Sequence, residues 1–187
     1  MSQFEFVTVF VSVVMALAVA ELLAGFGRLI RERDRVRVYW VHVAWMVLAV
    51  LGLTQGWWHT WNARSHEFST FFEFLALVLP GLIFVIIAFV LSPTIKEDGP
   101  FDLRAYYFHQ IRWVAPMFAI QLATLALTNA ALGIERVATP INAIRLVVIG
   151  LFVYLGFSAN ARAHVAAVVV TWGLFGLAVA ILFFGNG

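Results

Sequence analysis

Hydrophobic residues fall into six long runs along the chain, and short polar stretches separate these runs. A bilayer core about 30 Å thick needs roughly 20 apolar helical residues to cross it. Six runs have that length: about 6–27, 38–60, 70–92, 112–132, 140–159 and 163–184. Because the connections are short, we expect consecutive helices to be antiparallel neighbours. The pattern predicts an all-α integral membrane protein in which residues 1–187 form a single six-span bundle.

Particular residues indicate where these helices begin or bend. Thr70 and Thr139 stand immediately before the third and fifth spans, where a threonine side chain can cap a helix. Pro80 and Pro116 lie inside spans, where each removes a backbone hydrogen bond, so we predict kinks at both. Residues 101–111 are too polar for the bilayer core and are expected to form an interfacial helix of one or two turns that leads into the fourth span.

The basic residues predict the orientation of the bundle. Nine lie in or beside the first, third and fifth connections: Arg28, Arg31, Arg33, Arg35, Arg37, Lys96, Arg104, Arg112 and Arg162. On the opposite side are Arg64 and Arg136, with Arg145 inside the fifth span. Cytoplasmic connections carry the excess of Lys and Arg. We therefore predict that the odd-numbered connections are cytoplasmic and that both termini are outside.

The aromatic residues agree with this orientation. Trp and Tyr are enriched at the two membrane–water interfaces. Near the outer ends of the spans are Trp57, Trp58 and Trp61, and near the inner ends are Tyr39, Trp40, Tyr106, Tyr107 and Trp113. We expect these side chains to mark the two interfaces.

Composition supports a membrane protein and narrows the chemistry. Hydrophobic residues make up 63% of the chain and charged residues 12%, against about 45–50% and about 25% in an average soluble domain. The absence of cysteine excludes disulfides, thiolate ligands and thiol nucleophiles. Eleven of the twelve basic residues are Arg, which, beside abundant Ala and Val, is typical of a GC-rich bacterial genome. The expected location is a bacterial inner membrane.

Glu21 is the clearest ionisable residue at membrane depth. It lies about five residues from the inner end of the first span, or ~8 Å deep at the rise of an α-helix. Ionisable residues in this position are candidates for function, here a proton or cation site. Alternatively, Glu21 forms a structural ion pair with Arg28 on the same helix or with Arg112 from the fourth span.

Two further polar features are Arg145, in the outer half of the fifth span, and a polar stripe along the fourth span. Arg145 follows Asn142 by one turn of the fifth span and could bind an anion or set charge selectivity. It could equally pair with Glu73 or Glu135, which enter from the same side. The fourth span carries a stripe of polar residues, Gln121, Thr124 and Thr128. Such a stripe can line a polar path, although hydrogen bonding between packed helices is its commoner use.

Three histidines are candidates for a metal or haem site. His42, His109 and His164 each lie near the cytoplasmic start of an even-numbered helix, so their depths should match. Imidazole is a common ligand for zinc, copper and haem, and Glu21 could provide a fourth group. Without a metal, the same cluster could sense cytoplasmic pH. Because histidine is also common at membrane interfaces, matched depth alone leaves the direction of each ring open.

These observations favour a small channel or transporter for an ion or small solute. Small-residue faces such as Ala16/Ala20/Ala24 and Ala115/Ala119/Ala123 favour a homo-oligomer. The alternatives are a haem- or metal-binding membrane redox protein and a non-catalytic membrane partner subunit. Nothing in the sequence favours an enzyme, because it has no HExxH motif and its aspartates lie in the connections. The expected partners are the lipid bilayer, other copies of the chain and the small ion or solute, with no nucleic acid.

Overall fold

The computed structural model describes residues 3–61, 64, 70–95 and 99–184. Lys96, which contributes to the charge bias above, lies outside these residues. The described chain contains six helices: α1 (Gln3–Arg31), α2 (Trp40–Thr60), α3 (Phe71–Leu91), α4 (Leu103–Ala131), α5 (Pro140–Phe157) and α6 (Ala161–Phe184). Each is long and apolar enough to cross a membrane. The prediction of an all-α protein with six membrane-spanning helices is confirmed.

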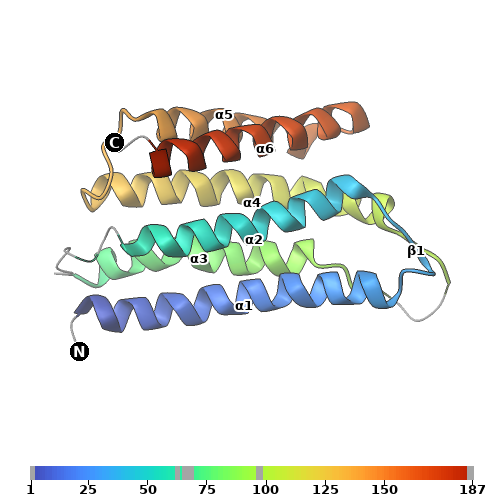
Figure 1. Cartoon of the computed structure of the whole chain (residues 1–187), viewed down its shortest axis with the longest axis horizontal. Helices are drawn as coiled ribbons and strands as arrows, with labels where there is room; N and C mark the ends of the chain where they lie inside the picture. Colours follow the sequence, from blue (N-terminus) through green and yellow to red (C-terminus); the bar gives the residue numbers. More distant parts are fainter. Residues whose placement is uncertain (1–2, 62–63, 65–69, 96–98, 185–187) are drawn as a thin grey trace.

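The helices run antiparallel in one bundle (Figure 1). The end at which α1 begins and α6 ends is here named the termini end, and the opposite end, which holds the two short strands, the bridge end. Neighbouring helices pack in the closed order α1–α2–α6–α5–α4–α3, and α3 returns to α1. The helix α2 also contacts α3 and α4. Each helix therefore packs against at least two others, and α2 packs against four.

Two threonines cap helices where the sequence predicts them. The Thr139 hydroxyl accepts a hydrogen bond from the Asn142 amide at the start of α5 (3.1 Å). The Thr70 hydroxyl accepts one from the Glu73 amide at the start of α3 (3.3 Å). Each bond satisfies a backbone donor that has no partner within the helix.

The fourth helix is longer than the predicted fourth span. Helix α4 begins at Leu103, within the predicted interfacial segment 101–111, and continues without interruption to Ala131. The interfacial position of its first turns remains a prediction. The Asp102 carboxylate caps this start by accepting hydrogen bonds from the amides of Arg104 (2.8 Å) and Ala105 (3.1 Å). The resulting helix of 29 residues is about 44 Å long, longer than the bilayer core. Its polar first turns can therefore extend beyond the lipid tails.

Both internal prolines lie within assigned helices. Pro80 is inside α3 and Pro116 inside α4. The kinks predicted at these positions remain predictions.

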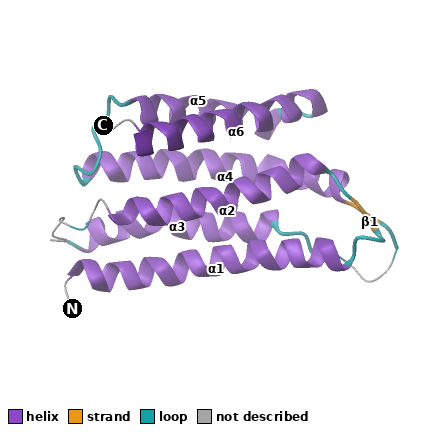
Figure 2. Cartoon of the chain, in the orientation of Figure 1, coloured by secondary structure: helices purple, strands orange, loops and turns teal. Residues whose placement is uncertain are grey.

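A short parallel pairing joins two connections at the bridge end (Figure 2). Strand β1 (Val36–Arg37) pairs with β2 (Phe101–Asp102), with Val36 opposite Phe101. The Phe101 amide also donates to the Arg35 carbonyl (2.9 Å). Because β1 precedes α2 and β2 precedes α4, the pairing fixes the starts of these two helices relative to each other.

The residues of the predicted aromatic belt are not all on the surface. The tryptophans Trp40, Trp57, Trp58, Trp61 and Trp113 are exposed, and their place at the membrane interfaces remains a prediction. Tyr107 is instead only 1% exposed, and its hydroxyl is hydrogen-bonded to a side chain inside the bundle. Its place follows from the helical face that it shares with buried Ile111 and Val114.

Replacing Gly25 with Ala should destabilise the contact between α1 and α3. A Cβ atom at this position would lie 2.8 Å from Ser92 Oγ and 2.9 Å from Met46 Cε. Ser92 Oγ is fixed because it donates to the Glu21 carbonyl (3.0 Å). Overpacking of this kind costs about 1–3 kcal/mol, so the midpoint of thermal unfolding in detergent should fall. Gly27→Ala, with nothing within 4 Å of its added Cβ, is the control, and equal midpoints for both variants would contradict the prediction.

Candidate functional site

A cavity of about 500 Å³ occupies the half of the bundle nearest the termini end. All six helices contribute to its wall, which is mostly aliphatic and aromatic. At the termini end its edge is formed by Thr60 of α2 and by Glu135 and Thr139 from the connection between α4 and α5. Ligand sites of this size and character hold small organic molecules. The cavity is therefore the candidate functional site.

Four aromatic side chains form the floor of the cavity. Trp45 of α2 contacts Phe152 of α5, with ring centroids 5.1 Å apart. Phe152 stacks on Phe118 of α4 at 4.8 Å, and Phe118 meets Phe84 of α3 edge-on at 5.6 Å. All four rings line the cavity. They form a continuous series of ring contacts across four helices on the bridge-end side of the cavity.

A buried polar layer lies towards the bridge end from this floor. The Tyr107 hydroxyl is 2.7 Å from His164 Nδ1, and His164 Nε2 is 2.9 Å from the carbonyl oxygen of Ser158. Because a carbonyl only accepts, Nε2 carries the hydrogen. Neutral His164 then accepts at Nδ1 from Tyr107. These bonds connect α4, α6 and the C-cap of α5.

The structure brings two of the three candidate histidines to Tyr107. His42 contacts the Tyr107 ring at 6.0 Å between centroids, and His164 does so at 5.4 Å. His109 is exposed and lies two residues beyond Tyr107, which places it about 200° around α4. In the part of the chain that the structure describes, no group of three His, Asp or Glu side chains is arranged to hold a metal ion.

His42 is buried among aromatic rings. Its side chain is 1% exposed and also packs edge-on against Tyr106 at 5.6 Å. Neither ring nitrogen makes a well-aligned hydrogen bond within the described chain, although the backbone of Leu91 lies near the ring. The ring therefore closes the interior beneath the floor mainly by packing.

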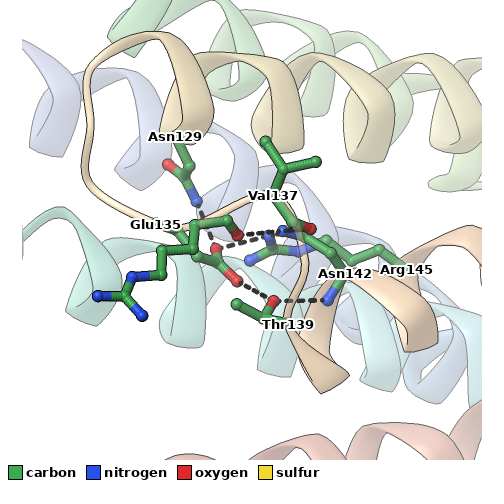
Figure 3. A network of polar contacts seen from close by, with 7 residues as sticks. Asn129, Glu135, Val137, Thr139, Asn142 and Arg145 are labelled. Carbon is green, nitrogen blue, oxygen red and sulfur yellow. Dashed lines mark hydrogen bonds and ion pairs between the residues drawn. The ribbon is translucent and has the colours of Figure 1, made fainter.

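An ion pair at the edge of the cavity holds the connection between α4 and α5. Arg145 Nη1 is 2.7 Å from Glu135 Oε2 and also donates to Asn142 Oδ1 (2.7 Å). Glu135 also accepts from Asn129 (3.2 Å) and Thr139 (3.0 Å). Figure 3 shows Glu135 at the centre of this network. Of the two partners expected for Arg145, the structure places Glu135 in contact with it.

The surroundings of Glu135 stabilise its ionised form. Burial alone would raise the pKa of the carboxyl group. The hydrogen bond and positive charge of Arg145, with the hydrogen bonds from Asn129 and Thr139, outweigh this effect and hold the pKa of Glu135 below its ordinary value. The pair is ionised at neutral pH and its charges cancel.

Glu21 lies outside the cavity wall and is paired. Its carboxylate is 2.6 Å from Arg28 Nη2, the same-helix partner that the sequence allows. Arg28 Nε also donates to the Pro93 carbonyl (2.9 Å), and Ser92 Oγ donates to the Glu21 carbonyl (3.0 Å). These contacts join α1 to the end of α3. The arrangement is that of a structural ion pair.

The polar stripe of the fourth helix separates into three environments. Gln121 and Thr128 line the cavity. The Thr128 hydroxyl donates to the Ala76 carbonyl of α3 (2.8 Å), so it joins two helices. The Thr124 hydroxyl donates to the Ile120 carbonyl of its own helix (2.8 Å), and Thr124 is not part of the cavity wall.

Sequence reasoning missed Thr171 and Trp45 as residues of the site. Both line the cavity, and both are at least 95% buried because they are 5% and 2% exposed. A lone threonine and a lone tryptophan in apolar helices carry no pattern that distinguishes them from ordinary packing residues. Only the arrangement of the helices places them on the interior wall.

Comparisons with family models, with curated proteins and with solved structures found no match to this chain. The function is therefore inferred from the geometry of the cavity and of the layers beneath it.

Proposed function

We propose that this chain is a multi-pass protein of the bacterial inner membrane that carries a small solute across it through the interior of the bundle. The observation that carries the proposal is the cavity of about 500 Å³, which all six helices line. A cavity lined by every helix of a membrane bundle is a candidate pathway, because it lies in the interior of the bundle. The polar groups of the wall can then replace part of the water that a solute loses.

The proposed orientation places the termini end outside. The first connection, at the bridge end, contains Arg33, Arg35 and Arg37, and Arg104 lies in the first turn of α4. Arg and Lys concentrate on the cytoplasmic side, so the bridge end is assigned to the cytoplasm. The cavity then faces the outside, and the described conformation is the outward-facing one.

Two layers close the path towards the cytoplasm in this conformation. The first is the aromatic floor around Phe152, and the second is the polar layer formed by His42, Tyr107 and His164. Transport requires both layers to separate while the outer edge closes.

One chain is sufficient for the proposed pathway, since its own six helices surround the cavity. Self-association remains a prediction. Ala16, Ala20 and Ala24 are exposed on α1 and could contact a second copy, whereas Ala115 and Ala119 are buried inside the bundle.

Single cysteines should show access to the interior from both sides of the membrane. The chain has no cysteine of its own. Gly52 lines the cavity and has no atom within 4 Å of an added Cβ, so Gly52→Cys should react with a membrane-impermeant thiol reagent from the outside. Ala167 is 3% exposed and follows His164 by about one helical turn towards the termini end, so Ala167→Cys should react from the cytoplasmic side whenever the inner layers open. Right-side-out and inside-out vesicles allow the two rates to be measured separately.

Gly150→Cys is the matched control for this experiment. Gly150 also has no atom within 4 Å of an added Cβ, but it is exposed on the outer surface of α5 and does not line the cavity. Its cysteine should be protected by lipid from both sides. If both the Gly52 and the Ala167 variants react from the same side only, transport is contradicted and a binding protein remains.

A further inference from the structure

Thr171 belongs to the cavity wall, and its hydroxyl group is buried and unpaired in the described chain. Thr171 is 5% exposed and lines the cavity, and its Oγ1 has no hydrogen-bond partner in the described chain. Threonines in helices usually donate to a carbonyl of the preceding turn. Thr54 and Thr124 do so, at 2.9 Å and 2.8 Å. Thr171 lacks this hydrogen bond, although a buried hydroxyl without a partner costs free energy of folding.

The position of Thr171 is near the floor. Tyr107 of α4 and His164 of α6 lie at one level, because their side chains are hydrogen-bonded. Thr171 follows His164 by seven residues, which places it about 10 Å towards the termini end. Gln121 follows Tyr107 by fourteen residues, or about 21 Å. The wall therefore presents a hydroxyl near the floor and an amide about one small-molecule length above it.

The charge of the wall restricts the solute. Of the described residues that line the cavity, only Glu135 and Arg145 carry a charge, and they neutralise each other at the edge. Gln121 is 7% exposed and makes no side-chain hydrogen bond in the described chain, so its neutral amide is also available. A charged solute in the deep part of the cavity would lose its hydration without gaining a counter-ion, which is strongly unfavourable.

We propose that the deep part of the cavity is a hydrogen-bonding subsite centred on Thr171, and that it selects a neutral amphipathic solute. The solute places its hydroxyl, carbonyl or amide group against the Thr171 hydroxyl, and its apolar body lies against the aliphatic and aromatic wall. This inference rests on the proposed transport function, because it names the class of solute that the cavity carries. The aromatic rings near Thr171 favour a flat apolar body.

Three probes of similar shape test this inference with the full-length protein in lipid nanodiscs. The probes are 1-naphthol, 1-methylnaphthalene and 1-naphthoate, which carry a neutral hydroxyl, a methyl and a carboxylate on the same ring system. Binding is measured by equilibrium dialysis, with binding to empty nanodiscs subtracted. The wild-type protein should bind 1-naphthol, and it should bind 1-naphthoate at least tenfold more weakly.

Thr171→Val retains the shape of the side chain and removes its hydroxyl. It should weaken 1-naphthol binding about fivefold, the worth of one hydrogen bond, and change 1-methylnaphthalene binding by less than twofold. Thr171→Ser should keep the wild-type preference. Thr124→Val is the control, since it makes the same substitution at a threonine outside the cavity wall.

The inference is overturned if Thr171→Val binds 1-naphthol within twofold of the wild type, if 1-naphthoate binds as tightly as 1-naphthol, or if 1-naphthol does not bind. These outcomes are separate from the cysteine experiment. If the Gly52 and Ala167 variants both react from the same side only and the probe selectivity is intact, transport alone is refuted. If Gly52→Cys reacts from the outside and Ala167→Cys from the cytoplasm but the probes show no selectivity, the subsite alone is refuted.

Discussion

Arg145→Met should destabilise the protein by about 3 kcal/mol. Breaking a buried ion pair costs about 3–5 kcal/mol. We expect the lower value here, because the pair lies at the edge of the cavity and its side chains are still 13% and 12% exposed. The substitution leaves Glu135 charged, without its strongest partner and still largely buried. Chemical unfolding of the purified protein in detergent measures the loss. The double variant Glu135→Gln, Arg145→Met removes both charges and should recover part of the lost stability.

The pH dependence of stability distinguishes this explanation from a loss of packing. In the wild type the pKa of Glu135 is held below its ordinary value, so the ionised pair contributes stability above about pH 4.5. That contribution is lost as the pH falls through the lower pKa of the folded state. In Arg145→Met, burial is opposed only by the hydrogen bonds from Asn129 and Thr139, so the pKa of Glu135 should rise relative to the wild type. The stability that the wild type loses as the pH falls through the lowered pKa should therefore be smaller in the variant.

A control substitution is available on a neighbouring residue. Arg136 is exposed on the same connection, and Arg136→Met removes an equal charge without breaking the Glu135 pair. It should change stability by less than about 0.5 kcal/mol. If Arg136→Met and Arg145→Met have the same effect and the same pH profile, the stabilisation comes from net charge and not from the pair.

The spans could be predicted because lipid imposes a length and an apolar composition on every helix that crosses it. The starts of α3 and α5 could also be predicted, since the caps at Thr70 and Thr139 act on amides three residues away. The start of α4 could not be predicted in this way. It depends on the Asp102 cap and on the pairing of β1 with β2, which joins segments more than 60 residues apart.

The candidate site could be predicted only in part, because sequence gives depth and not direction. The matched depths of His42 and His164 followed from topology, and both rings contact Tyr107. His109 has a similar depth but faces away, because two residues rotate a helix by about 200°. The role of Thr171 depends on a wall built by six helices, so no local pattern around it could reveal it.

Phe152→Ala should have the largest combined effect on stability and on the barrier inside the bundle. Phe152 is 4% exposed and contacts both Trp45 and Phe118. Truncating a buried phenylalanine costs about 3–5 kcal/mol, which should appear as a lower midpoint of thermal unfolding. The ring is also the centre of the aromatic floor, so its loss should open a gap between the cavity and the layer that contains Tyr107.

The cysteine experiment can measure directly whether Phe152→Ala opens the aromatic floor. Combined with Phe152→Ala, the Ala167→Cys variant should react from the outside as well as from the cytoplasm, with the outside rate raised at least tenfold. Phe157→Ala on the same helix is the control, because Phe157 is 89% exposed and contributes nothing to the cavity wall. It should leave both the unfolding midpoint and the outside rate near those of the parent. An unchanged outside rate in a folded Phe152→Ala protein would show that the Phe152 ring is not the barrier between the cavity and Ala167.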